Sequence, residues 1–265
     1  MIGIYFSGTG NTKYCVNKFV EYYNDNKENN IYSIEDKDCI SKIKDNNDIV
    51  FAYPIYHSDM PIIVRNFIEN NKDIFRNKNI FIIVTMALFS GDGTGCSARL
   101  LKKYGANITG GLHVEMPDCI GDVRILKRTI KKNKKIVRNA DIKIKKTVAN
   151  IKRGHYRKQG LSFASRLAGF FGQRIYLHNR NYKLQNKLKI DYTKCIGCGK
   201  CANICPMKNI QKENNKVIPL GKCTSCYRCV NSCPKKAITL IGKRVIEQCG
   251  IDKYKEEYIS ETIKE

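Results

Sequence analysis

The sequence has few acidic residues and no long hydrophobic run. Lys and Arg number 48 against 24 Asp and Glu, which gives a formal net charge of +24. No apolar stretch approaches the roughly 18 uncharged residues that a membrane-spanning helix requires. The first residues run directly into a strand-like segment rather than a secretory leader, which argues against a disulfide framework. We therefore expect no membrane span and a soluble, cytoplasmic protein.

The shortage of acids is concentrated in one segment. Residues 124–189 contain 21 Lys and Arg and a single acid, Asp141, whereas the rest of the chain carries 27 basic and 23 acidic residues. No nucleic-acid recognition module accompanies this basic segment, and a run of charge on a helix is usually a solvated face. We therefore expect no nucleic-acid partner. The excess charge favours an acidic protein partner instead.

Eight of the 13 cysteines form two runs that share the spacing C-x2-C-x2-C-x3-C-P. In this pattern three thiolates bind one 4Fe–4S cube, and the fourth, before a proline, binds the other cube of the pair. Zinc sites split their ligands into separate C-x2-C pairs and do not require the third cysteine. The sequence therefore predicts two 4Fe–4S clusters, one bound by Cys195, Cys198, Cys201 and Cys233, the other by Cys223, Cys226, Cys229 and Cys205.

The segment around these runs, from about residue 189 to 244, resembles bacterial-type two-cluster ferredoxins. The resemblance includes Gly197 and Gly199 between the first ligands. It implies a small α+β domain that carries electrons one at a time. The cysteines outside the pattern are interpreted as ordinary reduced thiols; they are Cys15, Cys39, Cys96, Cys119 and Cys249.

A loop of glycines and hydroxyl residues follows the first apolar segment, residues 2–6, and precedes apolar residues at helical spacing. A strand–loop–helix unit of this kind points backbone N–H groups and the positive end of a helix at an anion. Lys13 replaces the last glycine of a dinucleotide fingerprint, and no Lys stands at the Walker position. The loop is therefore predicted to bind a phosphate monoester through Ser7, Gly8, Thr9, Gly10, Asn11 and Thr12.

Further apolar segments at residues 48–53 and 79–85 indicate buried parallel strands, and a last strand is expected at about 108–116. The loop from Ser7 to Thr12 resembles the FMN-phosphate loop of flavodoxins, and this resemblance covers about residues 1–120. It implies bound FMN. It also implies a flavodoxin-like α/β fold, a doubly wound five-stranded parallel sheet in the order 2-1-3-4-5.

In flavodoxins the loops after the third and fourth strands enclose the isoalloxazine ring. Tyr56 is the first candidate for stacking on the ring and Phe89 the second, although either aromatic side chain could instead close the core. The resemblance implies that flavin contacts come from Pro54, Ile55, Tyr56, Thr85, Met86, Ala87, Phe89 and Gly91.

A basic helical connector is expected between the two units. Apolar residues recur at near-heptad spacing from Leu126 to Ile151, with lysines on the other faces, and Gly154 is expected to end the helix. A second amphipathic stretch spans 161–171. Three interpretations remain: a scaffold, a docking surface for an acidic ferredoxin, and a patch for an anionic membrane or nucleic acid. The aliphatic stripe favours a scaffold on the inner face, and the charge favours docking on the outer face.

The whole chain resembles the flavodoxin–ferredoxin fusions of anaerobic bacteria and archaea. The expected domains are 1–120, the connector 121–185, the ferredoxin domain 186–245 and a C-terminal tail 246–265, with a polar helix expected from Asp252 to Glu265. This predicts an iron–sulfur flavoprotein that transfers electrons between a low-potential donor, two 4Fe–4S clusters and FMN. No catalytic side chain is expected, because the cofactors supply the chemistry. The alternatives are a reductase with its own quinone, nitro or tetrapyrrole substrate, and an iron–sulfur module that binds nucleic acid.

Overall fold

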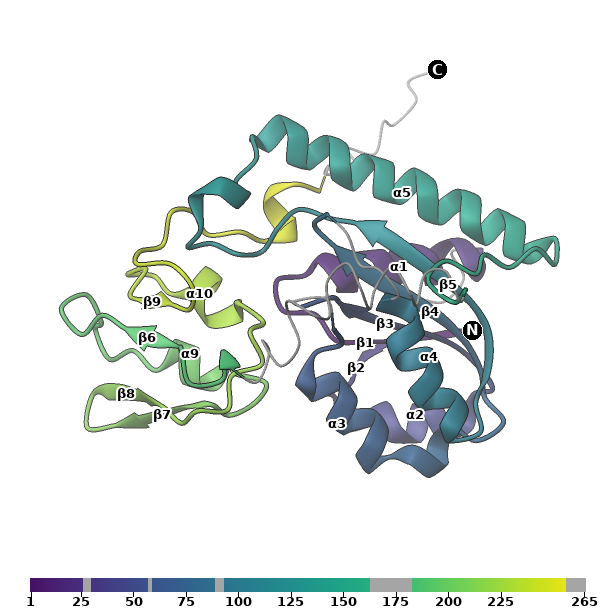
Figure 1. Cartoon of the computed structure of the whole chain (residues 1–265), viewed down its shortest axis with the longest axis horizontal. Helices are drawn as coiled ribbons and strands as arrows, with labels where there is room; N and C mark the ends of the chain where they lie inside the picture. The colour runs from purple at the N-terminus through teal and green to yellow at the C-terminus, as the bar shows by residue number, and fades with distance from the viewer. Residues whose placement is uncertain (26–29, 57–58, 89–92, 163–182, 256–265) are drawn as a thin grey trace, which may run out of the picture.

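The N-terminal unit is built on one parallel sheet. The computed structural model describes residues 1–25, 30–56, 59–88, 93–162 and 183–255. The five strands lie in the order β2-β1-β3-β4-β5, which confirms the predicted order (Figure 1). They are β1 (Ile2–Tyr5), β2 (Ile31–Ser33), β3 (Asp48–Pro54), β4 (Asn79–Met86) and β5 (Asn107–Glu115).

Side chains of the central strands alternate between two cores. Ile49 and Phe51 of β3 pack on one face of the sheet, which is covered by α2 (Cys39–Asp45), α3 (Ile62–Asn70) and α4 (Gly93–Lys103). Val50 and Ala52 pack on the other face, beneath α1 (Asn11–Tyr23) and α5 (Ile130–Lys152). Because both faces are buried, the strands have continuous apolar sequences rather than alternating ones. A 3-10 turn, η1 (Lys72–Phe75), precedes β4.

Helix α5 begins later than the sequence predicts. A 3-10 turn, η2 (Arg124–Leu126), comes first, and Thr129 caps the helix by accepting a hydrogen bond from the Lys132 N–H at 3.3 Å. Leu126, the first residue of the predicted apolar stripe, lies in η2, and the next one, Ile130, is 59% exposed. The later stripe residues are buried in the core shared with α1; they are Val137, Ile144, Val148 and Ile151. Residues 130–152 of the expected connector therefore cover the sheet. The second amphipathic stretch, from residue 163 onward, lies outside the described residues.

The C-terminal unit has its own hydrophobic core and two small antiparallel sheets. Strand β6 (Lys189–Ile190) pairs with β9 (Ile238–Thr239), and β7 (Ile210–Glu213) pairs with β8 (Lys216–Pro219). Two short helices, α9 (Lys200–Asn203) and α10 (Arg228–Ser232), lie between them. Among the described residues no helix is both long and apolar enough to span a membrane.

The chain after residue 245 returns to the sheet unit. The sequence predicts a polar helix from Asp252 onward; its described residues, 252–255, are not α-helical and continue a single 3-10 turn, η4 (Ile251–Lys253), into Tyr254. Ile251 and Tyr254 are both buried in the core between α1 and α5. Two apolar side chains three residues apart are too few to show a helical period in the sequence. They are enough to bury one side of a single turn. Residues 256–265 lie outside the described residues.

Candidate cofactor sites and the contact between them

A cleft lies where the loops after β1, β3 and β4 meet the segment after β5, at the carboxyl ends of the parallel strands. It holds about 650 Å³ of empty space, part of which is open to solvent. Phe89 and Gly91 lie outside the described residues. Of the other residues predicted to contact FMN, all except Gly10 line this cleft: Ser7, Gly8, Thr9, Asn11, Thr12, Pro54, Ile55, Tyr56, Thr85, Met86 and Ala87.

The loop at the start of α1 is held by its own polar groups. The Ser7 hydroxyl accepts a hydrogen bond from the Gly10 N–H at 3.1 Å, and the buried Thr12 Oγ1 lies 2.8 Å from Thr85 Oγ1. Asn11 Nδ2 donates to the Pro117 carbonyl at 2.7 Å, which leaves its buried Oδ1 without a partner. Hydroxyls and the N–H groups of the first helical turn, in a loop whose own residues include no Lys or Arg, fit a phosphate monoester. The orphaned amide oxygen fits a ligand hydroxyl.

Gly10 makes room for the C-terminal turn. Its φ of +94° lies in the left-handed region, and a Cβ there would clash with the Ile251 side chain. The Ile251 N–H donates to the Thr9 carbonyl at 3.2 Å. The loop that lines the cleft is therefore backed by the end of the chain, a contact between segments about 240 residues apart.

Tyr56 occupies the boundary between the two units. It is 7% exposed, and its hydroxyl oxygen lies 2.9 Å from the position that a Cβ on Gly8 would take. Desolvation raises the pKa of Tyr56 well above its ordinary value, and the Cys119 and Cys226 sulfurs raise this pKa further. Tyr56 is therefore a neutral phenol against the phosphate loop. Its stacking on a flavin stays a prediction.

Two pockets in the C-terminal unit bring the cysteines together in the predicted crossed sets. Cys195, Cys198, Cys201 and Cys233 line one pocket of about 350 Å³, and Cys205, Cys223, Cys226 and Cys229 line another of about 380 Å³. No three His, Cys, Asp or Glu side chains among the described residues form a single-ion site. This donor chemistry, four thiols converging on each pocket in the spacing of a two-cluster ferredoxin, fits a cube. Burial raises the pKa of Cys226 to about 12, so binding as a thiolate releases a proton.

The second cysteine run differs from the first at two strained positions. Gly197 and Gly199 of the first run have φ values of +66° and +75°. The equivalent residues of the second run are Ser225 and Tyr227, with φ values of +59° and +58°. A residue with a side chain costs about 1–2 kcal/mol in this left-handed conformation. Such strain is concentrated at functional sites, and both side chains in fact line the cleft of the sheet unit.

Tyr227 forms a wall between the cleft and the second cysteine pocket. Among the described residues it is the one that lines both cavities. Its hydroxyl donates to Asp122 Oδ1 at 3.0 Å. Asp122 Oδ2 accepts the N–H groups of residues 240–242 at 2.7–3.0 Å. Asp122 belongs to the segment that leads from β5 to α5, so this buried carboxylate joins the two units through four hydrogen bonds.

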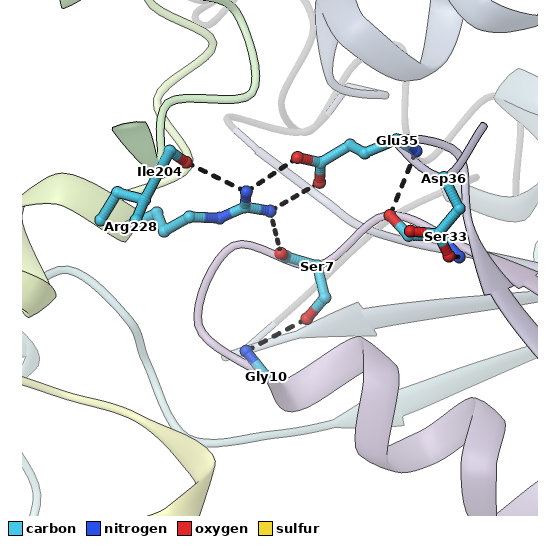
Figure 2. Close-up of polar contacts among 7 residues, drawn as sticks. All are labelled: Ser7, Gly10, Ser33, Glu35, Asp36, Ile204 and Arg228. Carbon is cyan, nitrogen blue, oxygen red and sulfur yellow. Dashed lines mark hydrogen bonds and ion pairs between the residues drawn. The ribbon is translucent and has the colours of Figure 1, made fainter. Parts of the chain in front are cut away.

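Arg228 makes a second junction beside the same cysteines (Figure 2). Its guanidinium forms a two-point ion pair with Glu35 at 2.8 and 2.6 Å, and donates to the Ser7 carbonyl at 2.9 Å. It also donates to the Ile204 carbonyl, next to Cys205, at 3.1 Å. Glu35 is oriented by the turn after β2, in which its N–H donates to Ser33 Oγ at 3.2 Å.

Comparisons with known proteins support both units. A family model described as a flavodoxin domain matches residues 2–108, and one described as a 4Fe-4S dicluster domain matches residues 178–238. Similar solved structures include the two-electron reduced flavodoxin of Megasphaera elsdenii (20% identity, TM-score 0.40, 44% of this chain and 89% of that one). Another is the Fusobacterium nucleatum flavodoxin bound to flavin mononucleotide (13% identity, TM-score 0.41, 58% and 98%). No curated protein matches the chain.

The two family matches and the observed sheet order define an iron–sulfur flavoprotein of electron transfer. The flavodoxin domain comes first and the 4Fe–4S dicluster domain second, which supports a flavodoxin–ferredoxin fusion. The first domain implies FMN, and the second implies 4Fe–4S clusters.

The residues that join the two domains were missed by the sequence reasoning. Met116 to Ile120, Ser225 and Tyr227 line the cleft, yet none was a candidate. Cys119, interpreted as an ordinary thiol, is also among the cleft residues. One signal was available: the second cysteine run has Ser and Tyr where the first has glycine.

Proposed function

We propose that the chain passes electrons singly from a low-potential donor through two 4Fe–4S clusters to FMN, which then reduces an acceptor. Cys195, Cys198, Cys201 and Cys233 would hold one cluster, called the outer cluster because Cys198 is exposed. Cys205, Cys223, Cys226 and Cys229 would hold the inner cluster, whose pocket shares Tyr227 with the cleft. When bound, the clusters carry one electron at a time, and FMN exchanges one or two. The chain's own residues bind these groups and fix their separation.

The observation that carries this proposal is the wall shared by the flavin cleft and the inner cysteine pocket. Tyr227 lines both, and a Cβ on Gly8 of the phosphate loop would clash with the Cys226 carbonyl. Two cofactors bound in these cavities would therefore be neighbours. Asp122 and Arg228 hold this arrangement with hydrogen bonds that cross the domain boundary. A flavoprotein that acted independently of its clusters would not need such a contact.

The flavin site is proposed on the cleft residues of the first domain. The first turn of α1, with Ser7, Thr9 and Thr12, would bind the phosphate, and the loops around Tyr56 and Met86 would contact the ring. Desolvation raises the pKa of Asp118 at the cleft wall, whereas the hydrogen bond from the Ile120 N–H lowers it.

The donor is proposed to be an acidic ferredoxin that approaches the outer cluster. Cys198 is exposed, and Ile196 beside it is 60% exposed. Lys200 and Lys235 line the same pocket and are exposed to solvent. An apolar contact within a ring of positive charge suits a transient complex with an acidic protein. The basic outer face of α5 would add long-range attraction.

Rapid reduction of the loaded protein tests the relay. Anaerobic protein with about eight iron and eight sulfide per chain and bound FMN is mixed with a substoichiometric reductant. Bleaching of the cluster absorbance should be followed by bleaching of the flavin absorbance, at a rate independent of protein concentration. Protein loaded with FMN but not iron is the control for direct reduction of the flavin. A rate proportional to protein concentration would show transfer between molecules and contradict the proposal.

A further inference from the structure

Ser225 has a buried hydroxyl that no group in the described part of the chain satisfies. The residue is 2% exposed, and its Oγ is among the few buried side-chain oxygens without a hydrogen-bond partner. A buried hydroxyl without a partner is destabilising, because it has lost its hydrogen bonds to water. Its left-handed backbone adds strain that a glycine, as at Gly197, would avoid. Both features disfavour serine at this position for folding alone.

Ser225 lines the flavin cleft, although it lies between two proposed cluster ligands, Cys223 and Cys226. The described residues around the inner cysteine pocket include its neighbour Thr224 but not Ser225. The opposite walls of the cleft come from the loops of the flavodoxin domain. Ser225 is therefore part of the cleft wall, so a ligand in the cleft is the candidate partner for its hydroxyl, and the pocket of the cysteines is a separate cavity.

We propose that Ser225 is a flavin-contacting residue that the ferredoxin domain contributes, with its hydroxyl hydrogen-bonded to FMN. This inference rests on the proposed function in one respect, that FMN occupies the cleft. A flavodoxin domain by itself would lack this contact. FMN binding and correct folding of the loop around the inner cluster are consequently linked: each stabilises the arrangement that the other requires.

Equilibrium binding of FMN to the oxidised, cluster-loaded chain tests this contact without any electron transfer. Ser225→Ala removes the hydroxyl and keeps the Cβ. Ser225→Gly also removes it, and relieves the strain at φ +59°. Each should weaken FMN binding by about two- to tenfold, which is the range for one buried hydrogen bond. The Gly variant should unfold no earlier than the wild type, so its weaker binding cannot arise from unfolding.

Thr224→Ala is the matched control. Thr224 is the adjacent residue, is 3% exposed and has an equally unpartnered buried hydroxyl, but it lines the cysteine pocket rather than the cleft. Its FMN affinity should equal that of the wild type, with iron content measured for every variant. Wild-type affinity in both Ser225 variants would overturn the inference and leave the relay untouched. If electrons did not pass from the clusters to the flavin within one molecule, the proposed relay would be wrong. The difference in FMN affinity between the Ser225 and Thr224 variants would still support the inference.

Discussion

Arg228 links three parts of the molecule that the proposed relay must hold together. Its guanidinium contacts Glu35 of the flavodoxin domain, the Ser7 carbonyl at the phosphate loop and the Ile204 carbonyl beside Cys205. The ion pair is about three-quarters buried, with 22% and 26% of the two side chains exposed. A planar guanidinium can satisfy all of these acceptors at once, whereas a lysine ammonium cannot reproduce the fork. The residue next to a proposed cluster ligand therefore also fixes the proposed phosphate loop.

Replacing Arg228 should loosen the domain contact. Arg228→Ala is expected to lower the free energy of unfolding by about 1–2 kcal/mol and to slow the transfer from clusters to flavin at least tenfold. Arg228→Lys keeps the charge and loses the fork, so it should recover only part of both losses. Chemical denaturation and the rapid-reduction experiment measure these effects. Wild-type transfer rates in iron-replete Arg228→Ala would show that the junction has no role in the relay.

At the scale of elements, burial decided what the sequence could reveal. The strands buried on both faces, β3 and β4, are continuous apolar runs and were predicted within one residue of their ends. Strand β2 has three residues, none of them fully buried, and left no pattern to find. Helix α5 begins only at Ile130, and farther upstream the Gly121 carbonyl accepts hydrogen bonds from the distant second domain. Asp122 and Asn231 take part in those contacts, which local periodicity cannot register.

The residues of the cofactor sites also differ in how far the sequence reveals them. The cysteine sets and the phosphate loop are local patterns whose spacing follows from the ligand, so they could be listed from the sequence. The roles proposed for Ser225 and Tyr227 depend on the place where the second cysteine run meets a cleft formed by residues at least 100 positions earlier. Neither residue type carries a signal of its own at that spacing.

The C-terminal turn is expected to support the phosphate loop through packing. Tyr254 is 1% exposed, and its N–H donates to the Ile251 carbonyl at 2.8 Å. The Ile251 N–H in turn donates to the Thr9 carbonyl. Tyr254→Ala should lower the free energy of unfolding by about 3 kcal/mol through the cavity it leaves, and should weaken FMN binding as the turn detaches. Tyr254→Phe keeps the ring and is the control. Equal FMN affinity in the two variants would show that the loop does not depend on the turn.

At the scale of the whole molecule, positive charge occupies two separate surfaces. One is the outer face of α5, the long helix that covers the flavodoxin domain (Figure 1). Lys131 and Lys132 are exposed at the start of this helix. The other surrounds the outer cysteine pocket, where Lys200 and Lys235 stand beside the exposed Cys198. Charge on either surface can attract an acidic donor over about a Debye length. Only the second surface can also place the donor in contact with the pocket that would receive its electron.

The two surfaces should therefore respond differently to charge reversal. Lys200→Glu with Lys235→Glu should slow reduction of the clusters by an acidic ferredoxin more than Lys131→Glu with Lys132→Glu, because the first pair opposes both the approach and the contact. Each double variant changes the net charge by the same amount, so a difference between them reflects position. The wild-type rate should fall as salt rises from about 0.05 to about 0.5 M, and the transfer from clusters to flavin should stay unchanged in every variant. A larger loss from the α5 pair would move the docking site to that helix, and a rate insensitive to salt would contradict an acidic donor.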